Sequence, residues 1–142
     1  MDEPRDVICI ELETRKDHIA LPDVLTVFAA AEWTKCRSVD RVKKMLDHAN
    51  YVVMAKVGRR PVGFARLITD EAFRGFVEDV MVIPQMRQQG IGKRMMDVLE
   101  AMARKLALPR LELTTRETGF WEKLGYMKKE GSTSMVKSLT VR

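Results

Sequence analysis

The order of apolar and polar residues along the chain predicts short strands interrupted by amphipathic helices. Continuous or alternating apolar runs, typical of strands, stand at 7–12, 51–57, 62–68, 76–83, 110–114, 126–129 and 134–139. Helical spacing of apolar residues predicts helices over 22–31, after Ser38, after Gly90 and over 117–124. Because only 75–113 contains a β-α-β crossover, we expect an α+β, three-layer fold, in which a mixed, mostly antiparallel sheet carries helices on both faces.

A basic loop with two glycines follows the strand predicted at 76–83 and opens the longest predicted helix. The loop and the first helical turn contain Arg87, Gln88, Gln89, Gly90, Ile91, Gly92, Lys93 and Arg94. Glycine lets the backbone bend closely, and a helix N-terminus adds unpaired N–H groups and partial positive charge. The expected ligand is therefore an anion such as phosphate or pyrophosphate. The pattern is neither a P-loop nor the dinucleotide fingerprint, because Met95 stands where a third glycine would fall.

Composition and charge narrow the class of protein. With 142 residues and 46% apolar content, the chain predicts a single domain over 1–142. No apolar run could span a membrane and the acidic start is unlike a signal peptide, so we expect a cytoplasmic protein with no membrane partner. The two cysteines and two histidines lack metal-ligand spacing, which predicts no metal. The net charge of +5 is scattered and suits an anionic cofactor, so nucleic acid is not favoured as a partner.

The loop, together with the preceding Val82-Ile83-Pro84, resembles the RxxGxG acetyl-CoA signature of the GNAT superfamily of N-acetyltransferases. The resemblance implies that the strands at 76–83 and 110–114 splay apart and that the pantetheine arm of acetyl-CoA enters between them. It places the main chain of Met81, Val82 and Ile83 beside that arm, and the N–H groups from Gln88 to Lys93 at the pyrophosphate. The side chains of Lys93 and Arg94 would meet the ribose phosphate. Acetyl-CoA is then a cosubstrate.

Acetyl transfer needs an uncharged amine, so a base must remove a proton from an ammonium substrate. Glu78 is the candidate base, directly or through water, since it lies four residues before the V of V-x-P, where family members carry a polar catalytic or substrate-binding residue. Strand alternation puts Glu78, Val80 and Val82 on one face and Asp79 on the other. Glu78 as a salt-bridged or substrate-orienting residue is an equally weighted alternative.

The segment GFWEKLGY, residues 119–126, resembles the family motif FYEKLGF, whose tyrosine acts as general acid near the cofactor sulfur. Trp121 occupies that position here, and an indole N–H donates a hydrogen bond but delivers no proton at neutral pH. Tyr126 is a candidate substitute acid, with a core packing role as its alternative. The thiolate could also leave unaided or take a proton from water.

Substrate specificity is expected from the loop between the first two helices and from the closing strands. Glu32 and Trp33 could contact an ammonium group, although a packing role for Trp33 is the simpler interpretation. Arg66 could receive an acidic group, but a structural ion pair is favoured. The function these features predict is acetyl transfer from acetyl-CoA to a primary amine of a small molecule in a ternary complex. A noncatalytic acyl-CoA sensor and an enzyme acting on a protein or aminoacyl-tRNA amine are the alternatives, and a homodimer is left open.

Overall fold

The computed structural model of the protein describes residues 9–140. These residues fall into two compact units that divide after Glu112. The first unit, described from residue 9, contains all the strands of the described chain and the three longest helices. The second unit, described to residue 140, contains one short helix.

The first unit is built on a sheet of four antiparallel strands in the order β1-β2-β3-β4. The strands are β1 (Ile10–Glu13), β2 (Tyr51–Val57), β3 (Arg60–Thr69) and β4 (Gly75–Val82). The predictions at 51–57, 62–68 and 76–83 are confirmed, as is the largely antiparallel sheet. The strand predicted at 7–12 is observed from Ile10, and its first two residues lie outside the described chain.

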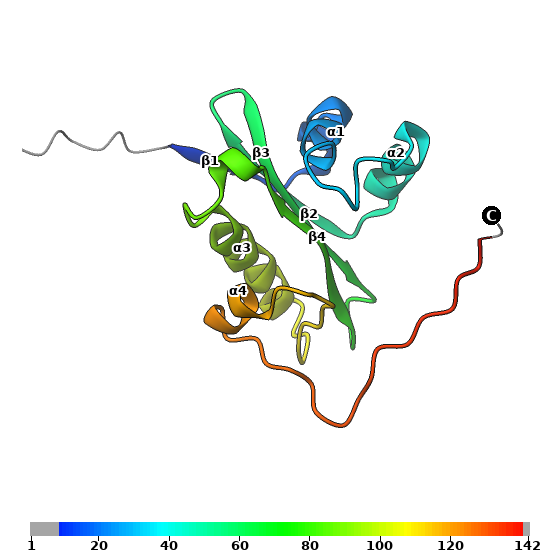
Figure 1. Cartoon of the computed structure of the whole chain (residues 1–142). Helices are drawn as coiled ribbons and strands as arrows, with labels where there is room; N and C mark the ends of the chain where they lie inside the picture. Colours follow the sequence, from blue (N-terminus) through cyan, green and yellow to red (C-terminus); the bar gives the residue numbers. More distant parts are fainter. Residues whose placement is uncertain (1–8, 141–142) are drawn as a thin grey trace, which may run out of the picture. The chain divides into compact units, whose positions relative to one another are not determined.

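Helices cover both faces of this sheet, as predicted (Figure 1). One face carries α1 (Leu21–Phe28) and α2 (Val39–His48), and the other carries α3 (Ile91–Lys105). Two short 3₁₀ helices, η1 (Lys16–His18) and η2 (Pro84–Met86), lie in the connections. The Ser38 hydroxyl accepts a hydrogen bond from the Arg41 N–H at 3.3 Å, which confirms the predicted cap of α2.

Apolar burial holds the helices to the sheet. On the α1 and α2 face, the rings of Phe28 and Phe64 meet edge to face at 5.4 Å within a buried cluster. On the α3 face, Gly63 leaves only enough room for the Met95 side chain, because a Cβ at Gly63 would lie 3.0 Å from Met95 Cε. The sheet is therefore closely covered on both sides, and its central strands β2 and β3 supply much of the core.

A bulge interrupts β4. The register pairs Arg66 with Glu78 but Phe64 with Met81, so β4 has one residue more than β3 between these pairs. Asp79 lies in the bulge with a φ of 54°. Because cross-strand partners point to the same face, the bulge shifts the alternation of side chains along the rest of β4.

The second unit has less regular structure than the sequence pattern predicts. Its helix α4 (Thr118–Lys123) is followed by Gly125 with a φ of 93°, which suits glycine at the end of a helix. The strands predicted at 126–129 and 134–139 are wrong, because this segment forms no strand and leaves Met135 and Val136 at least 90% exposed. Strands need a paired neighbour to be stable, and the described residues provide none for this segment.

The strand predicted at 110–114 is reduced to one parallel bridge. Phe76 pairs with Glu112, the Val77 N–H donates to the Glu112 carbonyl at 2.9 Å, and the Glu112 N–H donates to the Gly75 carbonyl at 2.9 Å. The parallel component of the predicted mixed sheet is therefore confined to the start of β4.

Candidate functional site

The glycine loop forms an unpaired N-terminus at α3. Gly90 is the residue before the helix and has a φ of 78°, and Gln88 also has a positive φ of 62°. The first backbone bond of α3 runs from the Arg94 N–H to the Gly90 carbonyl at 3.1 Å. Within residues 9–140, the N–H groups from Gln88 to Lys93 have no acceptor. Six consecutive N–H groups at the positive end of a long helix are chemically suited to bind an anion.

The cationic side chains beside this loop make only exposed contacts. Arg87 Nε donates to the Val82 carbonyl at 3.2 Å, and Lys93 Nζ pairs with Asp97 at 3.0 Å. Arg94 Nη2 lies 3.5 Å from the Ile10 carbonyl. Exposed contacts of this kind contribute little free energy, so they leave these side chains able to turn toward a bound phosphate. The Ile91 side chain is buried in the core, which leaves only its backbone N–H for a ligand.

The edge of β4 next to the loop is largely open. On one side β4 pairs with β3 along its length, whereas on its other side the parallel pairing is confined to Phe76. The backbone from Asp79 to Val82 therefore has no strand neighbour on this side within the first unit, although the Val82 carbonyl accepts from Arg87 Nε. Met81 and Ile83 are buried and Val82 is half-buried, so any ligand on this edge would meet the main chain.

The bulge changes where the two acidic residues of β4 point. Glu78 is the cross-strand partner of Arg66 and therefore shares its face, together with Met81. The prediction that Glu78 shares a face with Val82 is wrong, because Val82 pairs with Gly63 and the inserted residue breaks simple alternation. Asp79 was predicted on the face opposite Glu78, yet its carboxylate binds Arg66, the cross-strand partner of Glu78.

Glu78 is half-buried, and its side chain makes no hydrogen bond or ion pair with another residue of the described chain. Asp79 differs in both respects, since its side chain is fully buried and its Oδ2 accepts from Arg66 Nε at 2.7 Å and Arg37 Nη1 at 2.9 Å. The other carboxylate oxygen, Oδ1, is buried without a partner in the described structure. Glu78 is thus available for chemistry, whereas Asp79 holds two arginines in place.

A pocket of about 630 Å³ lies between the α1–α2 connection, α2 and β3. Its lining consists of Phe28, Trp33, Cys36, Arg37, Ser38, Arg41, Val42, Met45 and Arg66. Trp33 is 58% exposed and belongs to this lining, whereas Glu32 does not and pairs with Lys35 at 2.6 Å. The structure therefore does not bring the two predicted substrate contacts together. Arg66 forms the structural ion pair that the sequence favoured, and it also faces this pocket.

Sequence reasoning missed two residues of this pocket, Arg37 and Arg41. Their guanidinium groups come from a loop and from a helix start, and only their spacing of four residues around the Ser38 cap could have suggested a shared side. The Arg37 guanidinium lies over the Phe28 ring at 5.3 Å and over the Trp33 ring at 5.7 Å. These stacking contacts depend on the tertiary fold.

In the second unit, Trp121 and Tyr126 lie against each other. Their ring centroids are 5.2 Å apart at 76°, and the Tyr126 N–H donates to the Trp121 carbonyl at 3.0 Å. Phe120 meets Trp121 on another side at 5.0 Å. Trp121 is buried and Tyr126 half-buried, which gives both rings a packing role within this unit.

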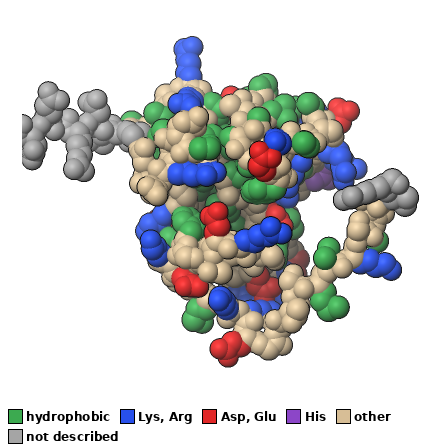
Figure 2. Space-filling model, in the orientation of Figure 1, with side chains coloured by type: hydrophobic (Ala, Val, Ile, Leu, Met, Phe, Trp, Pro, Cys, Tyr) green, Lys and Arg blue, Asp and Glu red, His purple; other side chains and the backbone are tan. Residues whose placement is uncertain are grey.

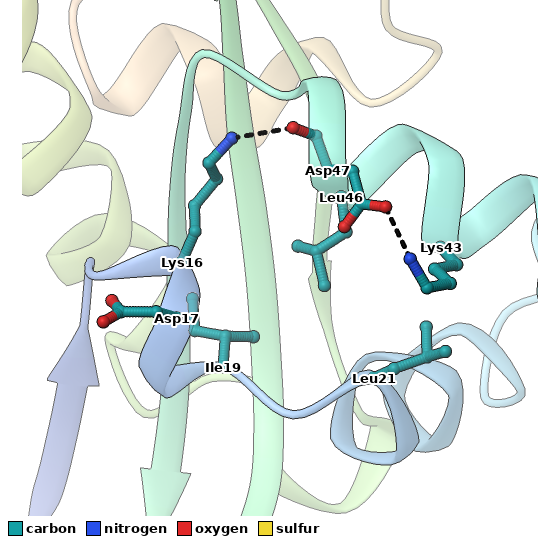
Figure 3. Close-up of a pocket in the computed structure, with 7 residues that line it drawn as sticks. All are labelled: Lys16, Asp17, Ile19, Leu21, Lys43, Leu46 and Asp47. Carbon is teal, nitrogen blue, oxygen red and sulfur yellow. Dashed lines mark hydrogen bonds and ion pairs between the residues drawn. The ribbon is translucent and has the colours of Figure 1, made fainter.

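A second pocket of about 380 Å³ lies beside η1 and α2 (Figure 3). Its charged groups are already paired, since Lys16 Nζ donates to the carbonyls of Asp47 and Ala49 at 3.1 and 2.7 Å and Lys43 pairs with Asp47 at 2.6 Å. Because both lysines of the lining already have acceptors, we assign no function to this pocket.

The fold and loop agree with a comparison to known sequences. Residues 18–126 match the family model described as the acetyltransferase (GNAT) family. The chain belongs to the GNAT family, as the resemblance of its loop implied.

Curated relatives share part of their length with this chain. A protein of Arabidopsis thaliana named GCN5-related N-acetyltransferase 1, chloroplastic, is 28% identical over 82% of this chain and 60% of its own length. A protein of Oryza sativa subsp. japonica named serotonin N-acetyltransferase 2, chloroplastic, is 31% identical over 70% of this chain and 52% of its own. The chain thus spans between half and two thirds of these relatives, and a cytoplasmic location stays a prediction.

Solved structures support the same fold. A GNAT acetyltransferase from Xanthomonas campestris pv. campestris matches with a TM-score of 0.77 and 25% identity, covering 93% of this chain and 94% of that one. A GNAT family acetyltransferase from Streptococcus pneumoniae TIGR4 matches with a TM-score of 0.76 and 26% identity, over 92% and 98%. No helix within residues 9–140 has the length and apolar content needed to cross a membrane.

Proposed function

We propose that the protein transfers an acetyl group from acetyl-CoA to a primary amine of a small molecule. The observation that carries this proposal is the run of N–H groups from Gln88 to Lys93, which lack acceptors in the described chain and lie at the start of α3 in a GNAT domain. A pyrophosphate fits this cradle, because it offers several acceptor oxygens and negative charge to N–H donors and a helix dipole.

The remaining contacts of acetyl-CoA follow from the geometry of β4. The open main-chain edge beside Met81, Val82 and Ile83 would hold the extended amide chain of the pantetheine arm. The phosphates of acetyl-CoA would be neutralised by Arg87, Lys93 and Arg94. Acetyl-CoA supplies an acetyl group already activated as a thioester. The protein then has to bring an uncharged amine to that carbonyl.

We assign removal of the proton from the acceptor amine to Glu78. It is half-buried, shares the face of Arg66 and lacks a partner in the described chain, so its carboxylate can accept a proton from the amine directly or through water. The amine nitrogen forms the new C–N bond, the C–S bond breaks and its electron pair leaves with the thiolate. Trp121 would contact the sulfur as a hydrogen-bond donor, and Tyr126 is the candidate proton donor to the thiolate.

The test of this function is thiol release from acetyl-CoA with a panel of polyamines, amino acids, amino sugars, arylalkylamines and short peptides. Wild type should turn over at least one amine, and Glu78→Gln should lower kcat by about 100-fold or more, because general bases typically contribute that much. A Glu78→Gln enzyme with unchanged kcat would remove Glu78 as the base while keeping the enzyme.

The loop is tested by binding, independently of turnover. Gly90→Ala forces a side chain into a φ of 78° and should weaken CoA binding measured by calorimetry. Gly58→Ala is the matched control, because Gly58 also has a positive φ, of 59°, and also has open space around its Cβ position. Equal loss of CoA affinity in both variants would contradict the assignment of the loop.

A noncatalytic acyl-CoA sensor is the second candidate, favoured by Trp121 at the position of the family's general acid. A sensor would bind CoA in the Gly90-dependent manner and show no thiol release with any amine. Thiol release with any member of the panel would exclude it.

A further inference from the structure

The pocket between the α1–α2 connection, α2 and β3 is strongly cationic. Three of its nine lining residues are arginines, namely Arg37, Arg41 and Arg66, and none is acidic. Asp79 offsets one of these charges from beneath, because it is fully buried and binds two of the arginines. The pocket therefore keeps an excess of positive charge facing its interior.

The arginines keep hydrogen-bond donors free for a ligand. Arg37 and Arg66 each use one nitrogen for Asp79, and a guanidinium has several more N–H donors. The Arg66 side chain is 16% exposed and lines the pocket, so part of it is accessible to a ligand there. The Arg41 side chain makes no hydrogen bond or ion pair with another residue within 9–140. These groups can therefore donate to an anion in the pocket.

The structure also holds two of the three arginines, Arg37 and Arg66, in place before any ligand binds. Arg37 is held by Asp79 and by the rings of Phe28 and Trp33, and the Arg66 side chain is only 16% exposed. Ser38 lines the pocket and caps α2, so the positive end of the α2 dipole faces the same space. A prearranged set of guanidinium forks is the arrangement that recognises carboxylate or phosphate groups.

Glu78 lies next to this pocket. It is the cross-strand partner of Arg66, and such partners have Cβ atoms about 5 Å apart on one face of a sheet. A ligand whose ammonium group meets Glu78 would therefore reach the arginines with a group only a few bonds away. An amine that carries no anionic group would offer no acceptor to the guanidinium N–H groups that Asp79 does not bind.

We propose that the acceptor amine carries a carboxylate or phosphate a few bonds from its nitrogen, and that Arg37, Arg41 and Arg66 bind this anionic group. The identification of the acceptor rests on the proposed acetyl transfer. Binding of an anion by the pocket does not depend on that function. It narrows the acceptor from amines in general to anionic amines.

Matched pairs of amines test the proposal. Phenylalanine against phenethylamine differs by a carboxylate, and O-phosphoethanolamine against ethanolamine differs by a phosphate. We expect kcat/KM to be about tenfold or more higher for the anionic member of at least one pair, because charge-assisted bonds to arginine are strong. A preference within the first pair would identify the anionic group as a carboxylate, and a preference within the second would identify it as a phosphate. Equal or lower kcat/KM for the anionic member of every pair overturns the proposal.

Arg41→Gln and Arg59→Gln give the matched comparison. Both arginines are exposed and lack a side-chain partner within residues 9–140, but Arg59 lies in the β2–β3 turn and does not line the pocket. Arg41→Gln should raise KM for the anionic amine several-fold and so reduce the preference for it, whereas Arg59→Gln should leave this preference unchanged. An equal effect of both variants would show that net charge, not this pocket, attracts the anion.

A binding measurement distinguishes failure of the anion site from failure of the proposed acetyl transfer. Heteronuclear NMR titration with O-phosphoethanolamine at constant ionic strength should shift amide signals of Arg37, Arg41 and Arg66, with weaker shifts for ethanolamine. If no amine is acetylated but these shifts appear and are lost in Arg41→Gln, the anion site stands and the enzyme assignment fails. If amines are acetylated and the pocket amides stay unmoved, the anion site fails and the enzyme assignment stands.

Discussion

Asp79 is a residue at which backbone conformation and charge depend on one another. Its φ of 54° belongs to the left-handed region, which Asp and Asn adopt more readily than most residues. That conformation turns the carboxylate toward Arg37 and Arg66, and one oxygen binds both. Loss of this carboxylate would leave two partly buried guanidinium groups facing each other without compensation.

Asp79→Asn keeps the shape and the left-handed preference but removes the charge. We expect the free energy of unfolding to fall by about 3 kcal/mol, because removal of one partner from a buried ion pair leaves an uncompensated charge. Urea unfolding measures this change. Asp97→Asn is the control, because its pair with Lys93 is exposed and its loss should cost under about 0.5 kcal/mol. Equal stability of Asp79→Asn and wild type would contradict a structural role for Asp79.

Asp70 predicts a dependence of stability on pH. Its Oδ1 accepts from the N–H groups of Arg74, Ala72 and Phe73, and these bonds lower the pKa of the carboxyl below 3.8. A lowered folded-state pKa stabilises the fold above the unfolded value, and this stabilisation is lost as pH falls through the folded pKa.

Asp70→Asn retains an acceptor oxygen without the charge. Wild type should be more stable than this variant near pH 7, and the difference should shrink as the pH falls through the lowered folded-state pKa of the Asp70 carboxyl. Urea midpoints measured across this range test the expectation. A difference between the two proteins that stays constant with pH would show that the charge of Asp70 does not contribute.

At the scale of elements, α3 and β3 approach each other closely at Gly63. A Cβ there would lie 3.0 Å from the Met81 carbonyl oxygen and 3.0 Å from Met95 Cε. The methionine side chain can move, but the carbonyl belongs to β4 and cannot move without disturbing the sheet. This contact links the helix that begins at the glycine loop to the strand that carries Glu78.

Gly63→Ala should therefore lower the free energy of unfolding by about 1–3 kcal/mol, as overpacking does. The control Gly119→Ala lies in α4 with open space around its Cβ position, and it should be neutral or stabilise by up to about 1 kcal/mol. Denaturant unfolding of the two variants gives the comparison. If Gly63→Ala were as stable as wild type, the sheet would have to accommodate the methyl group more easily than the contacts indicate.

At the scale of the whole molecule, the net charge of +5 belongs to a chain with 25 basic and 20 acidic residues. Figure 2 shows Lys and Arg side chains interspersed with acidic ones on the visible face, without a single basic patch. Nucleic-acid binding depends on clustered phosphate contacts and weakens steeply with salt. We therefore expect tRNA to bind weakly or not at all at about 150 mM salt. Saturable tRNA binding at that salt concentration would instead support the alternative that the acceptor is the amine of an aminoacyl-tRNA.

Ligand binding should stabilise the whole folded protein. CoA at about 100 times its dissociation constant should raise the free energy of unfolding by about 2.7 kcal/mol, because it binds the folded state alone. For a chain of this size, the melting temperature should rise by about 5–10 °C. The same CoA concentration should stabilise Gly90→Ala less than wild type. An unchanged melting temperature at millimolar CoA would contradict binding at the loop.

Local patterns in the sequence determined most of the elements of the first unit and the family. Helical spacing, the Ser38 cap and the turn before β3 act over a few residues, so the helices and the β2–β3 hairpin could be predicted. The glycine loop could be predicted for the same reason, because a phosphate cradle at a helix start is a property of consecutive residues.

Only the tertiary structure decided the features that depend on distant residues. The bulge at Asp79 arises from the register between β3 and β4, so alternation along β4 alone grouped Glu78 with Val82, which points to the other face. The closing strands were predicted from apolar runs, but a strand forms only where a partner pairs with it. The pocket lined by Arg37, Arg41 and Arg66 is formed by a loop, a helix start and a strand. No residue spacing in the sequence predicts that these three segments lie together.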